Sequence, residues 1–206
     1  MDRDSNHPMM DKVEVEAILD LLQNRIQGRA KALEFGCGGS TVTFSQYAAN
    51  WISIEHDDYW AKRMRSALPS SSPVEILVSP PDFPHSGMTP AKEGQFKSYI
   101  ASAKKICPED GFDFVLVDGR ARIDCILELH RSRLLGDGSI VVLHDFRRNR
   151  YISRLGEILE AYDLTSALTS GNLRGLGVFE YRGLGKANSS GSPASSSRRH
   201  NPQLST

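Results

Sequence analysis

Five strand-sized apolar runs alternate along the chain with segments of helical periodicity, and polar residues or glycines follow most of them. The runs cover residues 31–35, 51–55, 74–78, 113–118 and 139–143. Alternating strands and helices predict a parallel sheet with helices packed on both of its faces. The run at 113–118 is apolar between its two aspartates, which is typical of a central strand that is covered on both sides.

Two further strand-sized segments close the pattern. They lie at 164–168 and 177–181, after a helical segment at 150–162, and only a turn around 170–172 joins them. Strands joined by a short turn run antiparallel. This closing pair departs from a plain dinucleotide-binding sheet, in which helices separate the strands.

The chain divides into three parts. A helix expected over about 11–27 belongs to an N-terminal extension, residues 1–29, and the main domain covers residues 30–183. Residues 184–206 are rich in serine and almost free of large apolar side chains, so we expect a disordered tail. Prolines break the regular pattern between 79 and 95, and a loop of this length after a strand suggests a lid or a substrate wall.

The composition argues against several classes of protein. The formal net charge is zero, which speaks against a nucleic-acid partner and against a membrane-surface protein. The apolar runs fall far short of the roughly 20 residues that a membrane-spanning helix needs. The three cysteines are widely spaced and include no CxxC pair, so we expect no disulfide framework, no structural zinc site and a cytoplasmic location.

A glycine-rich turn follows the first strand. The sequence from Glu34 to Thr41 reads EFGCGGST, and a helix is expected to begin at its end. Glycines at 36, 38 and 39 permit a positive φ and leave room for a ligand, and a helix start presents unpaired N–H groups. Because open α/β sheets bind nucleotides at the carboxyl ends of their strands, this turn is a candidate ligand site.

Other strands also end in polar residues. Glu55 ends the second, Asp118 the fourth, and His144 and Asp145 the fifth. An acid roughly twenty residues after the turn can accept hydrogen bonds from both hydroxyls of a ribose. His144 and Asp145 are candidates for acid–base or metal chemistry. Each of these residues also has a plain structural interpretation, as a helix cap, a turn residue or a solvated acid.

Three segments together resemble the class I S-adenosylmethionine-dependent methyltransferases: EFGCGGST at 34–41, IEHD at 54–57 and VDGR at 117–120. With HDF at 144–146 they are similar, more narrowly, to bacterial-type methyltransferases of small molecules or polysaccharides, over about residues 30 to 182. The resemblance implies S-adenosylmethionine as cofactor and a small-molecule acceptor. It also implies an α/β, Rossmann-like three-layer sandwich, whose mostly parallel seven-stranded sheet has an antiparallel last strand.

The resemblance further implies roles for single residues. The glycine turn would line the methionine part of the cofactor, Glu55 would hold the ribose, Ser79 would flank the adenine, and Asp118 would lie near the methionine end and the acceptor. The cofactor-binding residues predicted in this way are Glu34, Phe35, Gly36, Cys37, Gly38, Ser40, Thr41, Glu55, His56, Ser79, Asp118 and Gly119.

The predicted catalytic residues are His144, Asp145 and Asp118. A hydroxyl acceptor needs a base, for which we expect His144 or Asp145, with His85 on the long loop as the next candidate. Asp118 and Asp145 are also oxygen ligands suited to a divalent metal. The sequence lacks the clear Asp-Asn pair of the catechol-type methyltransferases, so metal dependence is not favoured. Arginines at 120, 122, 147 and 148 suggest an anionic or sugar-like acceptor, or are simply solvated.

Two other functions stay open. An NAD(P)-dependent oxidoreductase would use the motif G-x-G-x-x-G, but Thr41 stands where its third glycine belongs, and such a sheet predicts no antiparallel closing pair. A binding protein that holds S-adenosylmethionine without transferring a methyl group is also compatible with the sequence.

Overall fold

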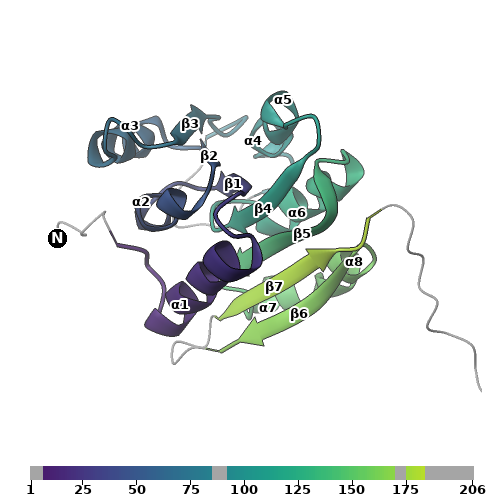
Figure 1. Ribbon diagram of the computed structural model, residues 1–206. Coiled ribbons are helices and arrows are strands. Elements are labelled where there is room, and N and C mark those ends of the chain that lie inside the picture. Colours follow the sequence, from purple (N-terminus) through teal and green to yellow (C-terminus); the bar gives the residue numbers. More distant parts are fainter. Residues whose placement is uncertain (1–6, 85–91, 170–174, 184–206) are drawn as a thin grey trace, which may run out of the picture.

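A computed structural model describes residues 7–84, 92–169 and 175–183 of the chain. Its seven strands form one sheet in the order β3-β2-β1-β4-β5-β7-β6 (Figure 1). The strands are β1 (Lys31–Phe35), β2 (Asn50–Glu55), β3 (Val74–Val78), β4 (Phe112–Val117), β5 (Leu135–His144), β6 (Tyr162–Leu168) and β7 (Leu176–Tyr181). Strand β7 runs antiparallel to β5 and β6, and the other pairings are parallel. The predicted mostly parallel sheet with an antiparallel last strand is confirmed.

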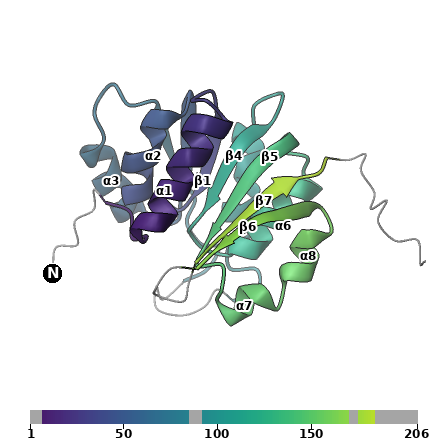
Figure 2. The ribbon, with the colours of Figure 1, turned by 60° about the horizontal axis from the view of Figure 1, so that its bottom comes forward.

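Helices cover both faces of this sheet, which gives three layers (Figure 2). Helices α1 to α3 pack on one face, and α4 to α8 pack on the other. Their bounds are α1 (Lys12–Asp20, continued by a π-helical turn, Leu21–Arg25), α2 (Gly39–Phe44, continued by a 3-10 turn, Ser45–Tyr47), α3 (Asp58–Ala67), α4 (Lys97–Ala101), α5 (Ala103–Ile106), α6 (Arg122–Arg131), α7 (Asn149–Ile152) and α8 (Leu155–Leu159).

The central strand β4 shows why its sequence is almost wholly apolar. Successive side chains of a strand point to opposite faces of the sheet. Phe114 and Leu116 are fully buried in the core beneath α1 and α2, together with Ile18. Val115 and Val117 are fully buried in the core on the other face, beneath α6. Both faces of this strand are therefore closed to solvent.

The helical spacing of Ile123, Ile126, Leu127 and Leu134 predicts a helix from 123 to 135, but helix α6 is shorter. It ends at Arg131, and the chain takes a left-handed conformation at Arg133, with φ of 55°. Strand β5 then begins at Leu135, which pairs with Phe112, and the next pair joins Ile140 to Phe114 across an irregularity in the register. Residues 136–138 read GDG, which predicts a turn before the strand, but they lie within β5 as part of a bulge.

The helix expected from 150 to 162 is also different, because it is split into α7 and α8. Ile152 and Leu159, which follow the helical period, are 44% and 37% exposed, and Ile158 is fully buried. The break between the two helices changes which side of each one faces the sheet. The period of a single continuous helix therefore does not predict which of these residues are buried.

Several expectations lie outside the described residues: His85 with part of the long loop (85–91), the turn at 170–174 and the tail at 184–206. In the described part of the chain, the cysteines form no disulfide. None of the helices described there combines the length and the apolar character that crossing a bilayer requires.

Candidate active site

Two turns at the carboxyl ends of β1 and β4 pack backbone against backbone. Gly36 has a φ of +91°, and its N–H donates to the carbonyl of Ile54 at 2.8 Å. A Cβ on Gly36 would lie 2.6 Å from the Cα of Gly119, closer than real Cβ atoms approach any heavy atom. This contact brings Asp118, which precedes Gly119, next to the glycine turn.

We expect Gly36→Ala to lower the free energy of unfolding by about 2 kcal/mol, because alanine strains this φ and meets backbone that cannot move aside. The matched control is Gly156→Ala in α8, where no heavy atom lies within 4 Å of the new Cβ. That variant should gain about 0.5 kcal/mol. Urea denaturation measures both, and equal stability of the two variants would contradict the close approach.

Glu34 lies under the glycine turn and is fully buried. Its carboxylate accepts hydrogen bonds from the hydroxyls of Ser40 (2.5 Å), Thr41 (2.6 Å) and Ser53 (2.6 Å) and from Nε1 of Trp51 (3.0 Å). Burial raises the pKa of Glu34 to about 7, although these hydrogen bonds act to lower it. The carboxylate thus joins the start of α2 to β1 and β2, and it presents no atom to solvent.

Glu55 ends β2 and is 3% exposed. One oxygen accepts from the backbone N–H of Cys37 at 2.9 Å, and the other accepts from the N–H groups of His56 (2.8 Å) and Asp57 (2.9 Å). Asp57 in turn caps α3 by accepting from the N–H of Trp60 at 3.1 Å. Glu55 therefore ties the glycine turn to the end of the neighbouring strand.

The remaining predicted cofactor residues lie around this junction. Ser79, just after β3, is buried, and its N–H donates to the carbonyl of Glu55 at 2.7 Å. Among the described residues, a Cβ on Gly38 would meet a single atom within 4 Å, the Ser40 Oγ at 3.9 Å, so this part of the chain leaves room there. Burial and the nearby Glu55 raise the pKa of the Cys37 thiol far above its ordinary value, which keeps the thiol protonated and unsuited to act as a nucleophile.

His144 and Asp118 form a hydrogen-bonded pair at the ends of β5 and β4. Nδ1 of His144 lies 2.7 Å from Oδ1 of Asp118, and the two side chains are 9% and 25% exposed. Burial acts to lower the pKa of His144, but the bond to Asp118 outweighs it, and this pKa is raised. Burial likewise acts to raise the pKa of Asp118, but Arg122 and His144 hold it below its usual value. The pair therefore orients the imidazole, whose Nε2 lies on the side of α1, 3.7 Å from Oε2 of Glu14.

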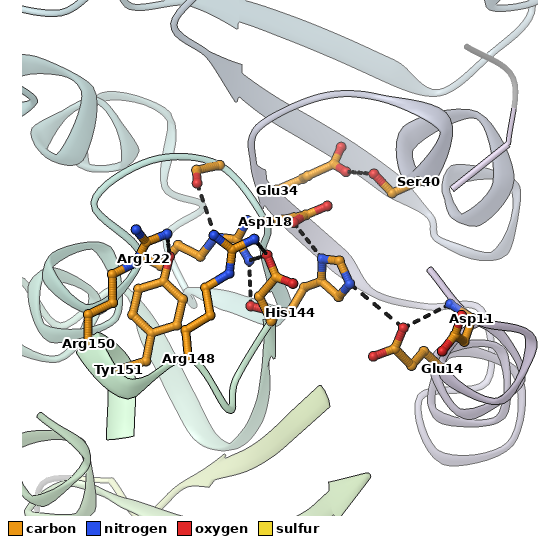
Figure 3. Close-up of polar contacts among 12 residues, drawn as sticks. Asp11, Glu14, Glu34, Ser40, Asp118, Arg122, His144, Arg148, Arg150 and Tyr151 are labelled. Carbon is orange, nitrogen blue, oxygen red and sulfur yellow. Dashed lines mark hydrogen bonds and ion pairs between the residues drawn. The ribbon is translucent and has the colours of Figure 1, made fainter. Parts of the chain in front are cut away.

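Arg122 joins the same cluster from the first turn of α6. Its Nη2 lies 3.0 Å from Oδ1 of Asp118, and its Nη1 lies 3.3 Å from Oδ2 of Asp145 and donates to the carbonyl of His144 at 2.5 Å. Arg148 also pairs with Oδ2 of Asp145, which is buried and has a φ of 58°. Two guanidinium groups thus neutralise Asp145, so His144 is the better base of the two residues predicted. Figure 3 shows Arg122 and Arg148 on one side of His144 and Asp118.

The same cluster contains residue types that can bind a metal ion. Ligand atoms of Asp118, His144 and Asp145 all lie within 4.8 Å of one another. However, Arg122 contacts both carboxylates, and Arg148 contacts Asp145. A divalent cation would have to displace at least one guanidinium and stand beside the other. The residues therefore do not fit a metal as they are arranged.

The sequence interpretation missed Glu14 of α1. It is 2% exposed, its Oε2 lies 3.7 Å from Nε2 of His144, and it accepts from the N–H of Asp11 at 2.9 Å. Among the described residues its Oε1 has no hydrogen-bond partner. The sequence contains a signal for the burial of Glu14. It lies four and eight residues before the fully buried Ile18 and Leu22, and this spacing places all three on the inward side of the helix.

Solved structures with the same fold include several methyltransferases. A methyltransferase-like protein from Silicibacter pomeroyi is 24% identical, with a TM-score of 0.62 over 87% of this chain and 90% of that one. The O-methyltransferase from Bacillus cereus, solved with S-adenosylhomocysteine (SAH), is 15% identical, with a TM-score of 0.59 over 86% and 85%. The N-methyltransferase NodS from Bradyrhizobium japonicum WM9, also with SAH, is 13% identical, with a TM-score of 0.54 over 87% and 93%.

The sequence matches no protein-family model and no curated protein. At these identities the comparisons establish the fold, which is the fold that the sequence resemblance predicted. Function has to be argued from the site itself.

Proposed function

We propose that the chain is an S-adenosylmethionine-dependent methyltransferase that acts on a hydroxyl group of a small-molecule acceptor. The observation that carries this proposal is the meeting of the glycine turn, Glu55 and the His144–Asp118 pair at one edge of a methyltransferase-like sheet. The residues proposed to hold a cofactor and the proposed base adjoin there, as an in-line transfer requires.

The cofactor would be held by residues whose groups suit it. Glu55 would accept hydrogen bonds from the ribose, Ser79 would flank the adenine, and the open backbone at Gly38 would admit the methionine part. Glu34 has no exposed atom, so we assign it a positioning role under the turn in place of the direct contact predicted from the sequence. When bound, S-adenosylmethionine supplies an electrophilic methyl group.

His144 would serve as the base. Asp118 accepts the hydrogen bond of its Nδ1, so Nε2, which lies 3.7 Å from Oε2 of Glu14, would take the hydroxyl proton as the acceptor oxygen gains the methyl group. Asp118 also stabilises the imidazolium that forms. Arg122 holds Asp118 ionised and fixes the end of β5 through the carbonyl of His144. The arginines occupy the metal position, so the proposal includes no metal.

Calorimetric titration tests the cofactor assignment. We expect the protein to bind S-adenosylmethionine and SAH, and Glu55→Ala to weaken both by about tenfold or more, since a buried charged acceptor is lost. The control is Asp58→Ala, which removes an exposed acid that pairs with Lys62. Binding of NADH alone would favour the oxidoreductase instead, and binding without turnover would favour the non-catalytic protein. Undiminished affinity in Glu55→Ala would overturn the ribose assignment.

A further inference from the structure

A cavity of about 370 Å³ opens at Gly119 and Arg122, which adjoin Asp118. It is lined by the turn after β4, the start of α6 and helices α7 and α8. We call it the arginine pocket, because the charged and aromatic residues that line it are Arg120, Arg122, Arg148, Arg150, Arg154, Asp124 and Tyr151. Of the arginines suggested by the sequence, Arg147 does not line it, whereas Arg150 and Arg154 were not foreseen.

Two of these arginines are neutralised within the protein. Arg122 pairs with Asp118 and Asp145, as described above. Arg154 lies 2.9 Å from Asp124 and 2.7 Å from Glu157. Their main role in the pocket is therefore to fix its walls, and a ligand would have to be recognised by other groups.

Arg150 carries a charge that the described part of the chain does not neutralise. Its Nη2 donates to the hydroxyl of Tyr151 at 3.1 Å, and its guanidinium lies 4.9 Å from the centre of that ring. None of its described contacts is with a carboxylate. The guanidinium of Arg122 lies 5.7 Å from the same ring, so Tyr151 keeps both groups in place.

Arg148 adds a second unsatisfied group. Its Nη2 pairs with Asp145, but its Nε is buried and has no hydrogen-bond partner among the described residues. A buried N–H without an acceptor is costly and calls for an explanation. Figure 3 shows the guanidinium groups of Arg122, Arg148 and Arg150 close together on one side of Asp118 and His144, with Glu14 on the other side.

We propose that the arginine pocket binds an oxyanion group, carboxylate or phosphate, of the methyl acceptor. Guanidinium groups recognise such groups through paired hydrogen bonds. The pocket is lined by Gly119 and Arg122, which adjoin Asp118, so an anion bound to Arg148 and Arg150 would hold the acceptor next to the His144–Asp118 pair. This inference rests on the proposed function and narrows its acceptor to hydroxylated acids or phosphorylated sugars.

Nuclear magnetic resonance titration of the full chain tests the pocket without an acceptor. Inorganic phosphate and acetate are added separately, with and without SAH, and the Nε–H signals of the arginines are followed. We expect a saturable shift of the Arg148 and Arg150 signals with at least one of the two anions. Arg150→Ala should raise the dissociation constant at least fivefold, and Arg148→Lys, which keeps the charge but lacks the Nε–H, should raise it as well.

The matched control is Arg29→Ala, an exposed arginine just before the amino end of β1, which should bind the anion as the wild type does. Equal weakening in Arg29→Ala, or no saturable shift with either anion, would overturn the pocket. SAH binding without anion binding refutes only this inference, whereas anion binding without SAH binding refutes the proposed function. The anion that saturates identifies a phosphate or a carboxylate.

Discussion

His144→Ala is expected to lower kcat for methyl transfer by about 10²- to 10⁴-fold, the usual contribution of a positioned general base. SAH affinity should change by less than about threefold, because the imidazole acts on the acceptor proton. The acceptor is first identified by screening hydroxylated acids and phosphorylated sugars with the wild-type protein. The rate of methyl transfer to it is then measured as SAH formation. His130→Ala is the control, since His130 lies on α6 and contacts Tyr181.

The pH dependence of the methyl-transfer rate is a second test of His144 as the base. The base must be neutral, and Asp118 raises the pKa of His144 above 6.5, so the wild-type rate should fall as the pH drops through that raised value. Asp118→Asn removes the charge that raises this pKa, and the fall should therefore move to lower pH. An unchanged pH profile in Asp118→Asn, or a rate in His144→Ala above half that of the wild type, would refute the role of His144.

Most of the sheet could be predicted from the sequence because its signals are local. The apolar runs of β1 and β3 were predicted with the bounds that the structure has. The positions of helix ends were predicted less accurately, because they depend on the backbone conformation of single residues, such as the left-handed conformation of Arg133. The bulge that starts β5 depends on pairing with Phe112, which is distant in sequence.

The site was predictable in outline for a geometric reason. Parallel strands present their carboxyl ends at one edge, so Asp118 and His144 had to be neighbours. The partners that set their chemistry come from elsewhere: Glu14 reaches His144 from α1, and Arg122 links Asp118 to Asp145. The helical period indicates that Glu14 faces inward, but the residues that these side chains contact depend on tertiary packing, which no local pattern encodes.

The position of Glu34 in the motif did not predict the environment of its side chain. The resemblance places it in the cofactor site, but strand alternation puts its side chain on the same face as Ala32, beneath α2. There it accepts four hydrogen bonds and cannot reach solvent. Alternation along β1 was a signal for this burial, and it predicts an effect on stability that does not depend on the cofactor.

We expect the free energy of unfolding to fall by about 3 kcal/mol between pH 5 and pH 8 because of Glu34 alone. Its pKa is about 7 in the folded protein, against an ordinary value of 4.5 for a glutamate, so the folded state binds the proton more tightly. Stability from this group is therefore present at low pH and is lost as the pH rises through 7. Urea denaturation at several pH values measures the slope.

Glu34→Gln keeps the size of the side chain and one acceptor oxygen, but it cannot ionise. We expect it to be less stable than the wild type at pH 5, because its amide group faces hydroxyl donors, and to gain about 3 kcal/mol relative to the wild type by pH 8. Glu75→Gln, at an exposed position of β3, should instead follow the wild-type slope. Parallel slopes for Glu34→Gln and the wild type would show that Glu34 is ionised throughout, and the burial that raises its pKa would then be offset by the four hydrogen bonds it accepts.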